Sequence, residues 1–193
     1  MIDINKIAIQ GVEGSFHDVV AKSYFNKNIN IHCCSTFDEL VDSILKKHSY
    51  QGVMAIENSI AGSIIPNYAL IDQNNLQIVG EYYYQIQHSL LALPGQNIEE
   101  IFEVHSHPMA LLQCKDFFSR YPHIKLVESD DTADSAREIY DKTIYKRAAI
   151  ASNVAADLYN LNILEESIQT INNNVTRFVI VQKESPSKTV NYN

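Results

Sequence analysis

Short apolar runs of the kind that form β-strands alternate along the chain with stretches of helical periodicity. Strands are predicted over residues 6–10, 52–56, 124–127, 148–151 and 177–182, over a short run that ends at Val104, and over a long, mostly extended stretch at 76–93. Helices are predicted between them. This alternation predicts an α/β fold with mainly parallel sheets flanked by helices. The long stretch near residues 80–93 indicates a crossing between two lobes.

The predicted helices are marked by their first turns. Ser15 suits the capping position of a helix that runs to Phe25, and Thr36 with Glu39 forms a capping box. Pro108 suits the first position of another helix. Further helices are predicted from Asp131 or Thr132 and over 153–159. Apolar faces at helical spacing support the second and third helices, with Phe37, Leu40, Val41, Ile44 and Leu45 on one and Leu111, Cys114 and Phe118 on the other.

Composition and charge exclude several classes of protein. The formal net charge is −8 and the chain has only four arginines, so a nucleic-acid or anionic-membrane surface is not predicted. No run approaches the ~18 apolar residues of a membrane span, and the N-terminus lacks an apolar signal core. Cysteines 33, 34 and 114 are odd in number and two are adjacent, which fits neither a disulfide framework nor a structural zinc site. We therefore expect a cytoplasmic protein.

Polar clusters stand at the ends of three apolar runs, where an α/β protein builds a small-molecule site. They are Glu57-Asn58-Ser59, Ser106-His107-Pro108 and the segment 173–178. Each cluster also has a purely structural interpretation: an Asx turn, a helix cap and an exposed strand face, respectively. The glycines at 11 and 14 match neither a dinucleotide nor a Walker A loop. No metal site is predicted, because His105 and His107 lack a third ligand at suitable spacing.

The order of the motifs is more specific than any one of them. GVEGSF, AIENSIAGS, GEYYYQIQHSLL, VHSHPMALLQC, DTADSA, RAAIAS and NNVTRFVIV together resemble the prephenate dehydratase catalytic domain over residues 7–182. Against the pattern usual in that family, this chain departs at Val12, Ser15, Met109 and Asp131. The resemblance implies two lobes similar to type II periplasmic binding proteins, with the site in the cleft. The catalytic domain would span residues 1–183, with one lobe from about 1–82 plus 175–183 and the other from about 83–174. Residues 184–193 would form a polar tail or linker.

The resemblance also implies a reaction: prephenate loses carboxylate and hydroxide to give phenylpyruvate, carbon dioxide and water, in phenylalanine biosynthesis. No metal or organic cofactor is expected. The implied catalytic residues are Thr176, Glu57 and Asn58. The implied substrate-binding residues are Ser15, Ser59, Ser106, His107, Gln113, Thr132, Ala133, Asn174, Arg177 and Phe178.

Roles for some of these residues follow from the chemistry. Thr176 is expected to donate a hydrogen bond to the departing oxygen, with a proton relayed from Glu57. Arg177 is expected to clamp the pyruvyl carboxylate, aided by helix N-termini near Ser15, Pro108 and Thr132.

Three questions stay open at the level of sequence. The substrate could instead be arogenate, in which an amino group replaces the keto oxygen, or the chain could be a non-catalytic small-anion binding module of the same fold. Family members commonly continue into an ACT regulatory domain, whereas this chain carries about fifteen residues after the TRF motif, so either the natural protein lacks that domain or the chain is an excised piece. A homodimer or tetramer is expected.

Overall fold

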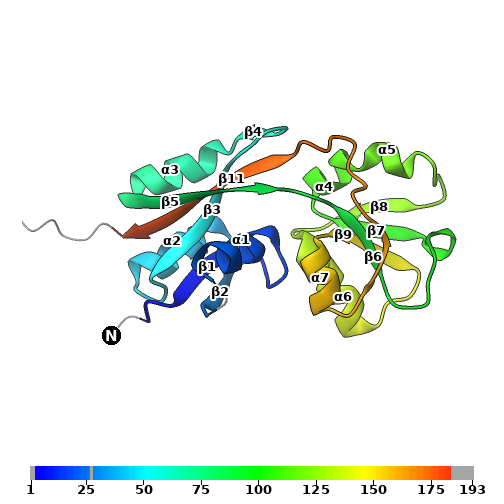
Figure 1. Ribbon diagram of the computed structural model, residues 1–193, viewed down its shortest axis with the longest axis horizontal. Coiled ribbons are helices and arrows are strands. Elements are labelled where there is room, and N and C mark those ends of the chain that lie inside the picture. The colour runs from blue at the N-terminus through cyan, green and yellow to red at the C-terminus, as the bar shows by residue number, and fades with distance from the viewer. Residues whose placement is uncertain (1–2, 27, 184–193) are drawn as a thin grey trace, which may run out of the picture.

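The computed structural model describes residues 3–26 and 28–183 and contains two β-sheets in two lobes (Figure 1). The first sheet has the order β2-β1-β3-β11-β5, with the short β4 paired to β3. The second has the order β10-β6-β9-β7-β8. In the first sheet the strands are β1 (Lys6–Gln10), β2 (Asn30–Cys34), β3 (Gln51–Asn58), β4 (Gly62–Ser63), β5 (Leu76–Gln85) and β11 (Val175–Lys183). In the second they are β6 (Ser89–Ala92), β7 (Glu103–Ser106), β8 (Lys125–Glu128), β9 (Arg147–Ala151) and β10 (Asn162–Glu165).

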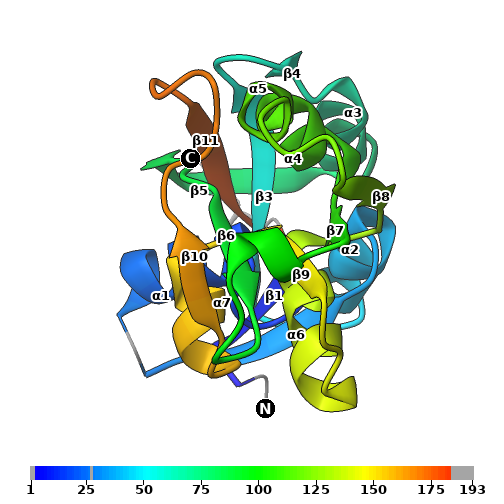
Figure 2. The same ribbon diagram turned by 90° about the vertical axis from the view of Figure 1, so that its right-hand side faces the viewer.

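Helices pack on both faces of each sheet, because alternate strand residues are apolar on both sides. The helices are α1 (Phe16–Phe25), α2 (Phe37–Leu45), α3 (Ile65–Gln73), α4 (Pro108–Gln113), α5 (Lys115–Phe118), α6 (Thr132–Lys142) and α7 (Asn153–Leu158), with one 3-10 turn at Ile98–Glu100. In the first lobe α1 covers one face, while α2 and α3 cover the other. In the second lobe α4 and α5 lie on one face and α6 and α7 on the other (Figure 2).

The predicted α/β class is confirmed, but both sheets are mixed rather than mainly parallel. Strand β1 runs parallel to β2 and β3, and β7 runs parallel to β8 and β9. Strand β11 is antiparallel to both of its neighbours, and β6 is antiparallel to β9 and β10. The reason is topological. Strands β6 and β11 each follow a crossing between the lobes, so each enters its sheet from the end at which the parallel strands finish.

Two crossings join the lobes and lie side by side. Residues 86–88 lead from β5 to β6, and residues 166–174 return from β10 to β11. The backbone N–H of Ile86 donates to the carbonyl of Asn174 at 2.7 Å, and that of Ile168 donates to the carbonyl of His88 at 2.9 Å. The long extended stretch predicted at 76–93 is therefore two strands in two lobes, divided at the first crossing.

Most predicted elements are present, and the structure contains several others. The caps at Ser15 and Thr36 are confirmed, and of the two alternatives for α6 the cap is Asp131. The additions are β2, β4, α3, β10 and the 3-10 turn. Strand β2 is an edge strand whose residues are mostly exposed or half-buried, so its apolar signal is weak. None of the helices in the described ranges has the length and apolar character needed to cross a membrane. The predicted tail at 184–193 lies outside the described residues.

Candidate active site

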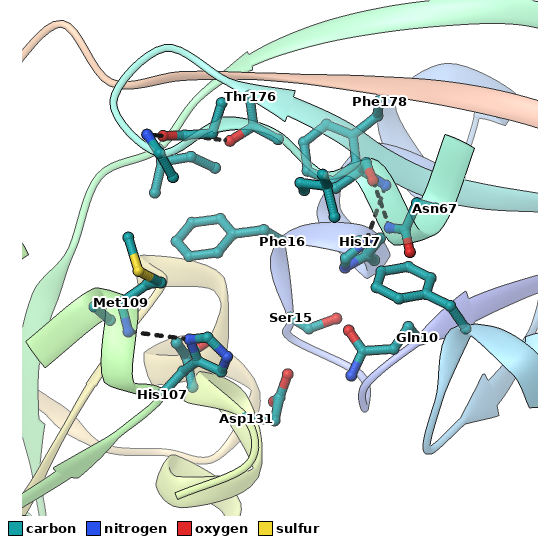
Figure 3. A pocket seen from close by; sticks show the side chains of 18 of the residues that line it. Gln10, Ser15, Phe16, His17, Asn67, His107, Met109, Asp131, Thr176 and Phe178 are labelled. Carbon is teal, nitrogen blue, oxygen red and sulfur yellow. Dashed lines mark hydrogen bonds between the residues drawn. The ribbon is translucent and has the colours of Figure 1, made fainter. Parts of the chain in front are cut away.

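A cavity of about 640 Å³ opens between the two lobes (Figure 3). Side chains from both lobes line it, because strand ends and helix starts of each sheet face the cleft. The first lobe and its crossings contribute Gln10, Ser15, Phe16, His17, Ser35, Thr36, Phe37, Asp38, Ala55, Asn58, Ala61, Ile64, Pro66, Asn67, Leu70, Ile86, His88, Asn174, Thr176 and Phe178. The second lobe contributes His107, Met109, Ala110, Gln113, Asp130, Asp131 and Thr132.

The pairing of β3 with β11 positions the side chains that form one wall of the cavity. Thr176 lies directly opposite Asn58, and Arg177 lies opposite Glu57. Because side chains alternate between the faces of a strand, the first pair and Phe178 face the cavity while the second pair faces outward. The Asn58 Nδ2 donates to Thr176 Oγ1 at 2.8 Å and to Asn174 Oδ1 at 2.7 Å.

The orientation of the Asn58 amide is fixed by the backbone. Asn58 Oδ1 accepts from the N–H groups of Ile60 and Ala61, at 3.0 and 2.9 Å, in the turn that follows β3. Its Nδ2 must therefore be the group that points to Thr176 and Asn174. Both amide hydrogens are then used, and Thr176 Oγ1 is an acceptor in this bond.

The donor-to-acceptor direction of these hydrogen bonds also fixes the bonds that reach the second lobe. Asn174 Oδ1 accepts from Asn58, so Asn174 Nδ2 donates onward to Gln113 Oε1 at 3.0 Å. Gln113 Oε1 also receives His88 Nε2 at 2.9 Å, which requires the proton of His88 to sit on Nε2. Two backbone amides thus set the direction of a chain of hydrogen bonds that runs from Thr176 to His88.

These hydrogen bonds determine what the hydroxyl group of Thr176 can donate or accept. Thr176 is buried, with 7% of the residue exposed. Its hydroxyl oxygen accepts a hydrogen bond from Asn58, while the hydroxyl hydrogen has no acceptor among the described residues. A hydroxyl that accepts one hydrogen bond is a better donor in another, because the bonds polarise one another. Thr176 is therefore set to donate a hydrogen bond into the cavity.

The cavity carries acidic groups and lacks fixed cations. Of the lining residues described, none is lysine or arginine, and three are aspartates: Asp38, Asp130 and Asp131. Burial lowers the pKa of His17 to about 4, and its Nε2 accepts the N–H of Ala55. Burial also lowers the pKa of His88. His107 Nδ1 accepts the N–H of Met109, so that nitrogen carries no proton. Burial therefore favours the neutral form of His17 and of His88.

Eight of the predicted site residues line the cavity. They are Ser15, Asn58, His107, Gln113, Thr132, Asn174, Thr176 and Phe178. Ser15 Oγ accepts from the N–H of Asp18 at the start of α1, and His107 caps α4. The structure thus brings together residues that are up to 163 positions apart in the sequence, from Ser15 to Phe178.

Five predicted residues lie elsewhere, and their expected substrate contacts do not fit this geometry. Glu57 and Arg177 face outward from the sheet for the reason given above. Ser59 Oγ donates to the carbonyl of Asn173, and Ser106 Oγ, fully buried, donates to the carbonyl of Ile150. Ala133 packs in the apolar core beneath α6. Ser59, Ser106 and Ala133 therefore support the site from behind its wall.

The expected clamp by Arg177 and relay by Glu57 need particular correction. Arg177 donates to Glu81 through Nε at 3.0 Å and pairs with it through Nη2 at 2.8 Å. Glu57 approaches Arg177 Nη1 at 4.0 Å. All three side chains are a third or more exposed, so these pairs contribute little to stability. Arg177 thus pairs with Glu81 and Glu57, and neither Arg177 nor Glu57 is among the residues that line the cavity.

We expect Arg177→Lys to leave both kcat and KM within about threefold of the wild-type values, because no contact to the cavity is lost. The midpoint of thermal unfolding should change little, because an exposed ion pair contributes little to stability. Steady-state kinetics of the purified variant checks this. A KM raised tenfold or more would return Arg177 to the binding site.

Several lining residues were not singled out from the sequence. His88 lies within the first crossing and is buried, and Phe16 packs edge-on against it with ring centroids 5.6 Å apart. Asn67 Nδ2 donates to the carbonyl of Ala55 at 2.7 Å. Asp131 was expected as a possible cap and as a departure from the family pattern, but not as a site residue. A lone buried histidine in an extended stretch is a signal for His88, but its partner Gln113 is known only once the chain is folded.

Metal ligation has no support in the described ranges. Over residues 3–26 and 28–183, no three or more His, Cys, Asp or Glu side chains cluster in a way that could hold a metal ion. The polar groups that line the cavity are amides, hydroxyls, imidazoles and three aspartate carboxylates, which suit an organic substrate with polar functions.

Known proteins resemble this chain over almost its whole length. The family model described as prephenate dehydratase matches residues 7–186. A relative from Arabidopsis thaliana, "Arogenate dehydratase/prephenate dehydratase 2, chloroplastic", is 37% identical over 93% of this chain and 46% of its own length. The chain thus spans about half the length of the curated relatives it matches.

Solved structures share the fold. A prephenate dehydratase from Arthrobacter aurescens, solved in complex with L-Phe, superimposes with a TM-score of 0.85 at 23% identity, over 94% of this chain and 61% of that one. A protein described as GqqA, a novel type of quorum quenching acylase, gives a TM-score of 0.83 at 28% identity, over 94% of this chain and 65% of that one. With a family model matched over nearly its whole length, this chain belongs to the prephenate dehydratase family.

Proposed function

We propose that this domain is a carbon–oxygen lyase that converts prephenate, or its amino analogue arogenate, by decarboxylative dehydration. For prephenate, the dianion takes up one proton and yields the phenylpyruvate anion, carbon dioxide and water. The ring C–O bond and the bond to the ring carboxylate break, and the electron pair left by carbon dioxide completes the aromatic ring. Aromatisation supplies the driving force, so the protein needs only to position the substrate and assist the departing hydroxide.

The observation that carries the proposal is the fixed polarity of the Thr176 hydroxyl. The leaving oxygen develops negative charge, and a donor aimed at it stabilises the transition state more than the ground state. Because Asn58 already donates to Thr176 Oγ1 at 2.8 Å, the threonine hydrogen is left for that oxygen. Glu57 is not proposed as the source of the proton that completes the water molecule, because it does not line the cavity.

The rest of the cavity suits a ring that loses a carboxylate. Phe16, Phe178, Ile86 and Leu70 supply apolar walls. With no lysine or arginine among the described lining residues, the ring carboxylate meets no ion pair that would stabilise it before it leaves as carbon dioxide. Catalysis by metal or cofactor is not part of the proposal.

The direct test is incubation of the purified protein with prephenate and measurement of the alkaline absorbance of phenylpyruvate. Saturable turnover supports the lyase. The competing function is a binding module that holds a small anion; it would give saturable binding by calorimetry and no product. A cytoplasmic location and a homodimer or tetramer belong to the same proposal, and light scattering after gel filtration measures the latter.

The hydrogen-bond chain predicts a graded effect at His88. His88→Leu removes the donor to Gln113 and should lower kcat about 3- to 10-fold, the size of one neutral hydrogen bond, with less change in KM. His88→Gln should recover most of the rate, because its side-chain N–H can take the place of Nε2–H. Steady-state kinetics of both variants checks this. Equal losses in the two would show that His88 matters only by its shape.

A further inference from the structure

The charge of the cavity does not match a substrate with two carboxylates and no cation. Its described lining has three aspartates, no lysine and no arginine, and burial lowers the pKa of two of its three histidines, His17 and His88. Like charges brought together in a partly desolvated cleft repel. A ligand that carries an ammonium group besides its carboxylates would relieve this repulsion.

Asp131 is the aspartate best placed to meet such a group. Its Oδ1 accepts the N–H of Asp134 at 2.9 Å and thereby caps α6. Its Oδ2 receives no hydrogen bond from any described side chain. Figure 3 shows the carboxylate of Asp131 pointing between His107 and Ser15. Burial raises the pKa of Asp131, while the N–H groups of Asp134 and Ala133 and the nearby His107 act in the opposite direction, so a cationic group on a ligand would favour the charged carboxylate.

An acceptor and a donor from different lobes converge at this end of the cavity. Gly11, which has a φ of +98°, marks the point: a Cβ added there would lie 2.8 Å from Asp131 Oδ2 and 3.3 Å from Ser15 Oγ. Ser15 Oγ accepts from the N–H of Asp18, which leaves its hydrogen to donate. A carboxylate beside a free hydroxyl donor is the pair of groups that an α-amino acid requires, one for its ammonium and one for its carboxylate.

The geometry of the substrate connects this end to the chemistry. In prephenate and arogenate the hydroxyl that leaves and the three-carbon side chain are on opposite carbons of the ring. Thr176 and Asp131 lie on opposite sides of the cavity, with Phe16 between them in the view of Figure 3. A ring with its hydroxyl at Thr176 therefore directs its side chain toward Asp131 and Ser15.

We infer that Asp131 binds the ammonium group of the substrate side chain and that this cavity selects arogenate over prephenate. The inference rests on the proposed function and specifies its substrate. The step is balanced: the arogenate anion and one proton give phenylalanine, carbon dioxide and water. With prephenate, the keto oxygen would face the carboxylate of Asp131, an acceptor against an acceptor.

The test compares kcat/KM for arogenate and prephenate in the wild-type protein and in Asp131→Asn. Asparagine also caps helices well, so α6 should keep its start. We expect the wild type to prefer arogenate by at least about tenfold. The variant should lose about 10- to 100-fold in kcat/KM for arogenate, while its value for prephenate stays level or rises. Asp134→Asn is the matched control, since it removes the same charge from the first turn of α6 outside the cavity.

A wild-type preference for prephenate, or equal losses on both substrates in Asp131→Asn, would overturn the inference while leaving the lyase intact. If neither substrate were turned over, the proposed function would fail, and calorimetry with the two products would still test Asp131. Phenylalanine should then bind the wild type more tightly than phenylpyruvate does, and Asp131→Asn should abolish that preference. An unchanged preference in the variant would remove Asp131 from amine recognition.

Discussion

Thr176→Val is expected to lower kcat by ~10²–10³ while the protein keeps its fold. Valine has nearly the shape of threonine and suits a strand, so β11 should stay paired with β3 and β5. What is lost is one hydrogen bond to the departing oxygen, and removing such a donor typically costs ~10²–10³ in rate. The measurement is single-turnover product formation at saturating substrate, alongside circular dichroism and thermal unfolding.

Thr176→Ser is the matched control for this prediction. Serine keeps the hydroxyl and loses only a methyl group, so it should retain most of the rate if the Asn58 amide still orients it. Near-normal turnover in the valine variant would show that another group assists the leaving hydroxide. The proposal for Thr176 would then have to be abandoned.

Asn58→Asp should be almost as damaging, although it changes one atom. The group that donates to Thr176 and Asn174 becomes an acceptor oxygen, while the other oxygen stays with Ile60 and Ala61. The Thr176 hydrogen would then bond to the new carboxylate rather than to the substrate. We expect kcat to fall by ~10² or more at neutral pH, since the transition-state donor is lost and a negative charge is added.

The control for Asn58→Asp is Asn172→Asp. Asn172 Oδ1 accepts from Gln169 Nε2, so aspartate can keep that bond, and the residue does not line the cavity. It should retain near-normal kinetics. If Asn58→Asp recovered activity at low pH, where its carboxyl carries a proton, the direction of the hydrogen bond would be identified as the cause. An active variant at neutral pH would contradict the polarity assigned to the chain.

Local signals in the sequence were enough to predict the elements that hold the site. Ser15 and Thr36 start helices because their side chains bond to nearby N–H groups, which depends on only a few residues. Strand β2 was missed because its residues are polar or half-buried at a sheet edge. The direction of β11 depends on where the chain returns from the second lobe, and no local pattern records that.

The residues of the site also differ in whether local sequence or tertiary structure determines their place. Asn58, Gln113 and Thr176, which motifs predict, line the cavity, whereas Arg177 and Glu57, which motifs also predict, lie outside its lining. The alternation of side chains along a strand held the necessary information for Arg177: with its two neighbours facing the cavity, it had to face outward. His88 could not be assigned a partner, because Gln113 reaches it only through tertiary structure.

The position of β11 also bears on how the chain folds. The second sheet uses strands that are contiguous in the sequence, from Ser89 to Glu165. The first sheet is incomplete without β11, which lies between β3 and β5 and is their shared neighbour. Closing that sheet joins residues more than 110 positions apart, such as Asn58 and Thr176, and contacts of such separation form slowly. The second lobe can therefore form early, while the wall that carries Thr176 is completed only when the last strand is inserted.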